Sequence, residues 1–241
     1  MKGLFITATD TDIGKTMITG AIAAAFKKRG YNVGVFKPLA SGAIIDANGK
    51  LVAEDANFLM KAAQIDESKR NEVNEICLEP ALTPAVAAKL SNVEIDMGKI
   101  IRHLVSNALK YDFILVEGVG GITSPLWKDY LIIDLMKKLN LPSIIVSQPK
   151  LGAINHTVLT YEYAKKHQVQ VNGFVFNQWD DKTAGILEKS NITYINKMTG
   201  LSLLGKMPLL DTNNLTMASL AQTAEQNLAI DEMLKIIKGG N

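Results

Sequence analysis

The stretch Thr9-Asp10-Thr11-Asp12-Ile13-Gly14-Lys15-Thr16 decides the fold, because it joins an apolar run to an amphipathic helical pattern. A loop that follows a strand and opens a helix presents backbone N–H groups, which make a positive concavity for phosphate. In such a loop Gly14 allows close approach, Lys15 supplies charge to the β and γ oxygens, and the Thr16 hydroxyl binds Mg²⁺. The stretch therefore predicts a loop that holds the phosphates of a nucleotide, although Thr9 stands where such loops usually have a glycine.

Outward from this loop, short apolar runs alternate with longer amphipathic segments. The apolar runs predict strands buried in a parallel sheet, at residues 4–7, 33–36, 113–116, 143–146 and 173–176, with a weaker sixth at 203–207. Predicted helices cover residues 15–28, 53–63, 84–90, 97–109, 130–139, 154–167 and 230–237. This order predicts an α/β fold with a doubly wound, mostly parallel sheet and helices on both faces. Residues 38–100 are the least regular part, where we expect loops of the site as well as helices.

The composition is that of an ordinary globular chain, with 241 residues, 47% hydrophobic and 21% charged. These values exclude a disordered chain, a collagen and a coiled-coil rod. The chain lacks an internal repeat and a linker rich in Pro, Gly or Ser, so we expect one domain over residues 1–241. In residues 210–241 we expect a C-terminal helix and a lid on the nucleotide side.

The net charge, the single cysteine and the lack of long apolar stretches limit which partners and which cellular location we expect. A net charge of +2 gives no electrostatic reason to expect nucleic acid or an anionic membrane as a partner. Cys77 is the single cysteine, which excludes an intramolecular disulfide and a cysteine metal cluster. The apolar run at residues 4–6 is too short for a signal peptide, and no stretch approaches the ~20 apolar residues of a membrane span. We therefore expect a cytoplasmic protein.

Two further stretches place polar groups at the ends of predicted strands. Val116-Glu117-Gly118-Val119-Gly120-Gly121 combines an acid, suited to Mg²⁺, with glycines that allow close approach to phosphate. Lys37-Pro38 ends another predicted strand, and ligands of open α/β sheets bind at the carboxyl ends of strands. We therefore expect Lys15, Lys37 and Glu117 at one edge of the sheet.

Several of these residues also have a plainer interpretation, which the pattern leaves open. Lys37 taken alone could be a solvated lysine at a strand end, and Asp55 could complement the charge of a helix N-terminus instead of binding metal. The three histidines, His103, His156 and His167, lie far apart without metal-ligand spacing. We expect structural or surface roles for them, and a role in the site stays open for His156, which follows Asn155.

Taken together, the motifs resemble the dethiobiotin synthetase family over roughly residues 3–210. In chain order they are Thr7-Ala8-Thr9-Asp10-Thr11-Asp12-Ile13-Gly14-Lys15-Thr16, Lys37-Pro38 with Ser41-Gly42, Asp55, Thr83-Pro84, Val116-Glu117-Gly118-Val119-Gly120-Gly121 and Lys150-Leu151-Gly152-Ala153-Ile154-Asn155-His156. The resemblance implies a P-loop NTPase fold and an ATP-dependent ligase of biotin biosynthesis. Its substrates would be 7,8-diaminononanoate, CO₂ and MgATP, and its products dethiobiotin, ADP and phosphate, formed through a carbamate and a carbamic-phosphoric anhydride. It also implies a homodimer with the substrate site at the subunit interface.

The resemblance assigns roles by matched position. It implies that Lys37 and Lys15 are catalytic, and that Mg²⁺ is held by Thr16, Asp55 and Glu117. The implied nucleotide-binding residues are Asp12, Ile13, Gly14, Lys15, Thr16, Met17, Asp55, Glu117, Gly118, Val119, Gly120, Asn177, Gln178, Met207, Pro208 and Leu209. Of these, Asn177-Gln178 follow a predicted strand as the family's adenine-reading pair does. The implied substrate-binding residues are Thr11, Ser41, Gly152, Ala153, Ile154 and Asn155, the last four receiving the substrate carboxylate from the partner subunit.

Three positions of this sequence differ from the family pattern. Ala8, Ala85 and Val119 stand where Gly, His and Ala are usual, which leaves the shape of the loop and of the diamine pocket open.

Rival protein classes share the phosphate loop. A switch-type P-loop ATPase, acting in assembly or partitioning, would carry an extra lysine where this chain has Asp10. A second rival is the class of synthetases that form the amides of cobalamin side chains. Those proteins are longer and carry a fused glutamine amidotransferase domain, whereas this chain has 241 residues and one cysteine. A non-catalytic nucleotide-binding module is disfavoured because the charged positions of the motifs are intact.

Overall fold

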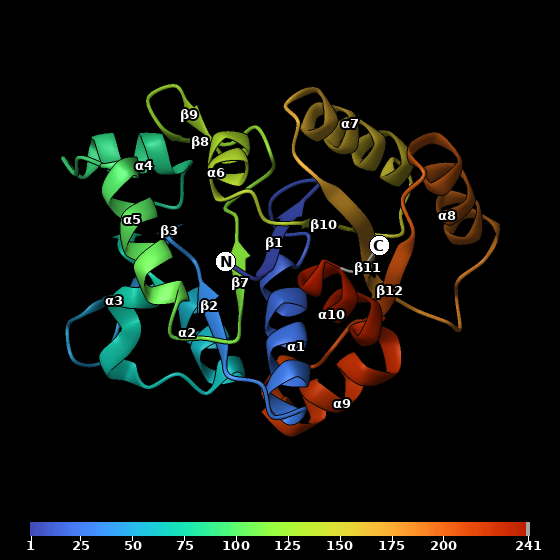
Figure 1. Ribbon diagram of the computed structural model, residues 1–241, viewed down its shortest axis with the longest axis horizontal. Helices are drawn as coiled ribbons and strands as arrows, with labels where there is room; N and C mark the ends of the chain where they lie inside the picture. The colour runs from blue at the N-terminus through green and yellow to red at the C-terminus, as the bar shows by residue number, and fades with distance from the viewer. Residues whose placement is uncertain (240–241) are drawn as a thin grey trace.

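A six-stranded parallel sheet forms the centre of the protein in the computed structural model, which describes residues 1–239 (Figure 1). The strand order is β12-β11-β10-β1-β7-β2. The strands are β1 (Gly3–Ala8), β2 (Val33–Phe36), β7 (Phe113–Glu117), β10 (Ser143–Ser147), β11 (Val171–Trp179) and β12 (Leu203–Pro208). The first four are buried along their whole length, as strands covered on both faces must be. The predicted α/β fold and its six strands are confirmed.

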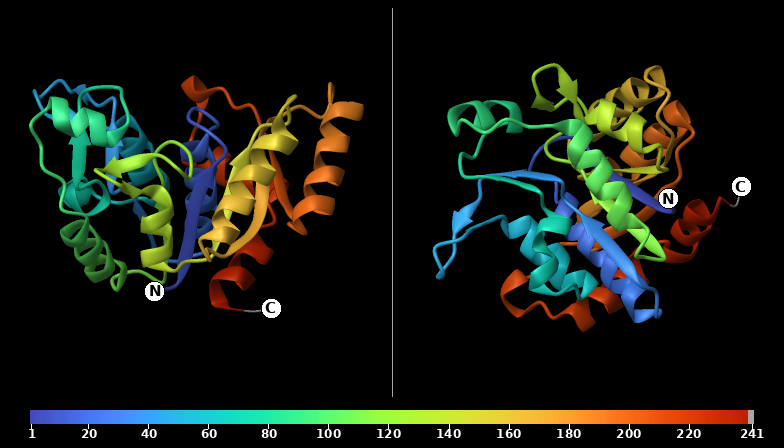
Figure 2. Two further views of the ribbon diagram at one scale, coloured as in Figure 1. Left: turned by 90° about the horizontal axis from the view of Figure 1, so that it is seen from above. Right: turned by 60° about the vertical axis from the view of Figure 1, so that its left-hand side comes forward.

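Helices cover both faces of the sheet, as the two views of Figure 2 show. One face packs against α1 (Lys15–Lys28), α2 (Glu54–Ala63), α9 (Met217–Asn227) and α10 (Ile230–Lys238). The other packs against α4 (Pro84–Leu90), α5 (Met97–Ala108), α6 (Ile132–Leu139), α7 (Ala153–Lys166) and α8 (Ile186–Thr199). Side chains alternate along β1, so that Leu4 and Ile6 join the first core and Phe5 joins the second.

Some elements differ from the sequence predictions. The patterns do not predict α3 (Arg70–Val73), α8 or α9, and α8 buries only Asn191 and Ile195, too little to leave an apolar stripe. Three short strand pairs were also not predicted: β3 (Leu39–Ser41) with β6 (Ile76–Leu78), β4 (Ile44–Ile45) with β5 (Leu51–Val52), and β8 (Pro125–Trp127) with β9 (Tyr130–Leu131). The helix predicted at residues 130–139 is wrong in its first two residues, because Tyr130 pairs with Trp127 in a hairpin.

The C-terminal helices pack on the helix that follows the phosphate loop. Leu220, Ala221 and Ala224 of α9 are buried in the core that α1 shares. The Arg29 guanidinium, directly after α1, donates to the Glu225 carboxylate of α9 at 2.6 and 2.7 Å. The C-terminal helix predicted at residues 230–237 is confirmed as α10, which ends at Lys238. The expected lid stays a prediction. None of the helices in residues 1–239 combines the length and apolar character that crossing a bilayer requires.

The carboxyl ends of the strands meet along one edge of the sheet. There β1 leads into the phosphate loop, Lys37 follows β2 directly, and β7 ends at Glu117. Because β1 lies between β7 and β10, the chain winds away from it in both directions. A crevice for ligands opens at such a switch point.

Candidate active site

The phosphate loop runs from the end of β1 to the first turn of α1. Gly14 caps this helix with φ 93°, in the left-handed region that favours glycine. Lys15 is only 6% exposed, and its Nζ donates to the Asp10 carbonyl at 3.0 Å. The loop thus folds around its own lysine, and the charge lies within the loop instead of in bulk solvent.

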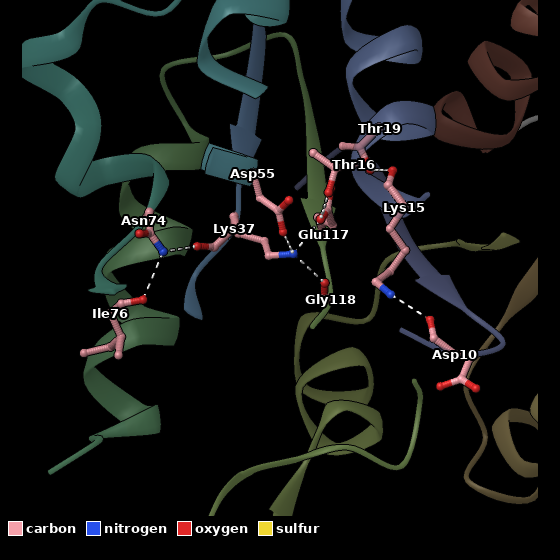
Figure 3. A network of polar contacts seen from close by, with 10 residues as sticks. All are labelled: Asp10, Lys15, Thr16, Thr19, Lys37, Asp55, Asn74, Ile76, Glu117 and Gly118. Atoms are coloured by element: carbon pink, nitrogen blue, oxygen red, sulfur yellow. Dashed lines mark hydrogen bonds and ion pairs between the residues drawn. The ribbon is translucent and has the colours of Figure 1, made fainter. Parts of the chain in front are cut away.

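Lys37 lies at the centre of an ionic network that Figure 3 shows from close by, in which Lys37 and Glu117 are buried and Asp55 is half-exposed. Its Nζ lies 2.8 Å from Asp55 Oδ2 and 2.5 Å from Glu117 Oε1, and it also donates to the Gly118 carbonyl at 3.2 Å. The Thr16 hydroxyl donates to the same Glu117 oxygen at 2.8 Å. Residues from α1, α2 and the ends of β2 and β7 therefore converge on one point. The plainer interpretation of Lys37 as a solvated lysine is wrong, since it is 3% exposed.

The backbone of Lys37 is fixed by a residue that the sequence reasoning missed. Asn74 Nδ2 donates to the Lys37 carbonyl at 2.7 Å and to the Ile76 carbonyl at 3.0 Å. The Lys37 N–H donates to the Val73 carbonyl at 2.8 Å. Asn74 lies in no motif of the sequence, so only its contacts reveal that it holds the strand end that carries Lys37.

Charges in the network shift pKa values in opposite directions. Burial alone would lower the pKa of Lys37, but the carboxylates of Glu117 and Asp55 raise it above its ordinary value. Burial would raise the pKa of Asp55, yet the Lys37 ammonium holds it below its ordinary value. Lys15 behaves differently: burial, and then the charge of Lys37, lower its pKa from 10.5 to about 8. Near neutral pH the network therefore holds ammonium groups beside carboxylates.

We expect the binding of MgATP to weaken as the pH rises through the pKa of Lys15, which burial and the charge of Lys37 lower to about 8. Only the ammonium form attracts phosphate oxygens, so the affinity should fall about tenfold between pH 7 and pH 9, with a proton taken up on binding. Calorimetry in two buffers of different ionisation enthalpy measures both effects. The variant Lys15→Arg, which stays charged across this range, should flatten the profile. An unchanged affinity without proton uptake in the native protein would contradict this assignment.

The oxygens beside Lys37 suit a hard divalent cation. Glu117 Oε2 is buried without a hydrogen-bond partner, and the Asp55 carboxylate and Thr16 hydroxyl lie in the same network. Mg²⁺ prefers oxygen ligands and usually binds one or two carboxylates together with phosphates and water. Within residues 1–239, no group of three or more His, Cys, Asp or Glu side chains is placed to hold a metal ion.

Two neighbouring cavities open at this edge of the sheet. The first, of ≈ 450 Å³, is lined by the phosphate loop, Lys37 and Asp55. The second, of ≈ 380 Å³, extends to residues 81–84 and Ser124. Both are lined by Thr11, Asp12, Ser41, Val119 and Gly120. A small molecule in the second cavity would therefore lie beside phosphates held in the first. Ala81, Leu82 and Ser124 were not among the predicted site residues, because nothing in their local sequence marks them.

The pair Asn177-Gln178 lies inside β11 and not after it as expected, because the strand continues to Trp179. Asn177 is 4% exposed, and its Nδ2 donates to the Ile13 carbonyl of the phosphate loop at 3.0 Å. Gln178 is exposed at φ 60°, and its side chain accepts a bond from Gln148 at 3.0 Å. The two neighbours thus face different surroundings, and only Asn177 touches the loop.

The remaining predicted residues fall into two places. Met207 and Pro208 end β12, where Met207 pairs in register with Asn177, and Leu209 follows with 74% of its surface exposed. The stretch from Gly152 to Asn155 begins α7 and lines neither cavity. This stretch is therefore separate from the ionic network within one copy of the chain.

The fold and the site together define a nucleotide-binding protein of the P-loop class. A family model described as an AAA domain matches residues 2–214. The MinC:MinD cell division protein complex of Aquifex aeolicus has a TM-score of 0.56 at 15% identity, covering 99% of this chain and 95% of that one. A ParA family ATPase from Chlorobium tepidum has a TM-score of 0.54 at 15% identity, with 99% and 97% covered. At this identity the likeness is one of fold.

Curated relatives narrow the class to a single family. The ATP-dependent dethiobiotin synthetase of Thermodesulfovibrio yellowstonii is 35% identical over 241 residues, which cover 97% of this chain and 99% of that protein. One from Clostridium botulinum strain Alaska E43 is 41% identical over 203 residues, covering 83% and 88%. The chain belongs to the ATP-dependent dethiobiotin synthetase family, a family of ligases, and the resemblance of its motifs is confirmed. The rival class of switch-type ATPases shares only the fold.

Proposed function

We propose that the protein closes the ureido ring of dethiobiotin from 7,8-diaminononanoate, CO₂ and ATP. One amine takes up CO₂ and loses a proton to form a carbamate. A carbamate oxygen then accepts the γ-phosphoryl group of ATP, which forms a carbamic-phosphoric anhydride and releases ADP. The second amine attacks its carbonyl, and phosphate leaves. The observation that carries the proposal is the pair of adjoining cavities, the first of which has Lys37 and Asp55 in its wall.

The chemistry asks for positive charge more than for a protein nucleophile, because the intermediates before ring closure are anionic. Lys15 and Lys37 supply fixed ammonium groups, and the phosphate loop supplies N–H dipoles. Lysines beside the diamine also disfavour its ammonium forms, which helps to provide the free amine that reacts with CO₂. Ser41 and Thr11 line both cavities and are proposed to contact the diamine.

Mg²⁺ is proposed as the cofactor, held by Thr16, Asp55 and Glu117. The buried Glu117 oxygen without a partner supports this assignment. When bound, the cation would neutralise charge on the β and γ phosphates. Since Lys37 contacts the same two carboxylates, it would share them with the cation and remain directed at the phosphoryl group.

We also propose a homodimer in which residues Gly152 to Asn155 of one subunit receive the substrate carboxylate in the site of the other. Two features support it: this helix start lines neither cavity of its own chain, and Leu151 and Leu159 beside it are 83% and 60% exposed. Residues 1–241 are proposed to act as one domain, since the C-terminal helices share the core of α1. Use of ATP supports the predicted cytoplasmic location.

The first experiment measures phosphate release from MgATP and bicarbonate, with and without 7,8-diaminononanoate, and follows the product by mass spectrometry. Release that depends on the diamine, together with dethiobiotin, is the expected result. Phosphate release at the same rate with and without the diamine, and without formation of dethiobiotin, would contradict the proposed reaction and favour a switch-type ATPase.

Mixing two inactive variants tests the shared site. Lys37→Gln and Asn155→Ala should each have low activity, because each removes one side of both sites in a dimer. After subunit exchange, half of the dimers are mixed and each has one intact site, so about a quarter of native activity should return. Neither parent alone should show this gain. If the mixture stays as inactive as its parents while exchange is shown to occur, each site lies within one subunit.

A further inference from the structure

A side chain from a distant strand holds the phosphate loop. Asn177, near the end of β11, donates from Nδ2 to the Ile13 carbonyl at 3.0 Å, and the two residues are 164 positions apart in the sequence. Its amide lies against Gly14, where an added Cβ would come within 1.9 Å of Nδ2 and 3.7 Å of Oδ1. Glycine at this position therefore serves the close approach of Asn177 as well as the left-handed backbone conformation.

This contact determines where a neighbouring N–H group points. The peptide between Ile13 and Gly14 is trans, so the Ile13 carbonyl and the Gly14 N–H point in opposite directions across one rigid plane. Gly14 lines the first cavity, whereas Asn177 does not. A residue that fixes the Ile13 carbonyl therefore also fixes the direction of the Gly14 N–H, in the wall of the cavity proposed for the phosphates.

We propose that Asn177 is a positioning residue for the phosphate loop, and that it strengthens the binding of the triphosphate whatever base is attached. The proposal rests on the nucleotide site described above. It differs from the role implied by the family resemblance, in which Asn177 reads adenine. One of the two Nδ2 hydrogens is used by the Ile13 carbonyl, so any contact with a base is an additional role of the same amide.

The test compares a ligand that contains a nucleobase with a polyphosphate that has none. Binding of MgATP and of inorganic tripolyphosphate with Mg²⁺ is measured by calorimetry for the native protein and Asn177→Ala. Loss of one hydrogen bond that orients the loop should weaken both ligands by a similar factor, about tenfold. A loss confined to MgATP would overturn the proposal, because it would show a residue that reads only the base. Absence of tripolyphosphate binding to the native protein would also overturn it.

Two further variants exclude a general effect on folding. Asn177→Leu keeps nearly the size of the side chain but removes the donor without adding charge, so it should weaken both ligands as well. It replaces Asn177→Ala in the test if that variant does not fold. Asn32→Ala is the matched control, because it also removes a bond from an Asn side chain to a backbone carbonyl. Asn32 Nδ2 donates to the Lys110 carbonyl at 2.8 Å, at the amino end of β2 and away from the phosphate loop. Its affinities should equal those of the native protein. No diamine is present in these measurements, so their outcome is separate from that of the dethiobiotin assay.

Discussion

Replacing Lys37 by Gln should lower the rate of dethiobiotin formation by about 10²–10³-fold while MgATP still binds. The Lys37 ammonium lies 2.8 Å from Asp55 and 2.5 Å from Glu117, and this arrangement holds a fixed charge in the wall of the cavity proposed for the phosphates. Gln keeps some hydrogen bonding but supplies no charge to the anionic intermediates. Single-turnover measurements give the rate, and calorimetry gives the affinity for nucleotide.

The same substitution leaves two carboxylates near each other without their shared cation. Breaking a buried ion pair by removing one partner costs on the order of 3–5 kcal/mol. Mg²⁺ should therefore raise the melting temperature of Lys37→Gln more than that of the native protein. Lys235→Gln is the matched control, because Lys235 is 68% exposed on α10 and remote from the network. Near-native turnover of Lys37→Gln would remove this lysine from the mechanism.

Replacing Thr16 by Val should weaken nucleotide binding about 10- to 100-fold when Mg²⁺ is present, and much less when it is absent. The Thr16 hydroxyl lies 2.8 Å from Glu117 Oε1, so it belongs to the proposed set of metal ligands. Val has nearly the same shape but no oxygen, so the substitution removes this ligand without opening a cavity. Binding of ATP is measured by calorimetry with Mg²⁺ and with a chelator.

Thr16→Ser is the matched variant for this prediction, since it keeps the hydroxyl and loses only a methyl group. It should retain most of the Mg²⁺-dependent affinity. If Thr16→Val binds ATP as the native protein does under both conditions, Thr16 is not a metal ligand. An equal loss with and without Mg²⁺ would instead indicate a defect of the loop itself.

Local patterns predicted most of the fold because its strands are nearly all apolar and its helices carry apolar stripes. The pattern fails where an element depends on contacts from elsewhere. Helix α8 buries only Asn191 and Ile195, and the hairpin of Tyr130 with Trp127 replaces what looked like the first residues of α6. Periodicity records only the burial that is visible within one segment, so elements of this kind escape it.

The candidate site shows the same division. Thr16, Lys37 and Glu117 could be named from motifs because each stands at a strand end or a helix start. Asn74 and Ser124 could not, because their roles come from contacts or cavity walls that no local pattern marks.

The sequence by itself determined the phosphate loop, since its strand, glycine, lysine and threonine are contiguous and their backbone dictates a phosphate-binding concavity. It also determined the parallel α/β fold, through the alternation of apolar runs and amphipathic helices. Only the tertiary structure decided that Lys37, Asp55 and Glu117 form one ionic network and that Asn177 holds the Ile13 carbonyl. Such contacts depend on strand order in the sheet, which brings together residues distant in the chain and buries the charges of Lys37 and Glu117.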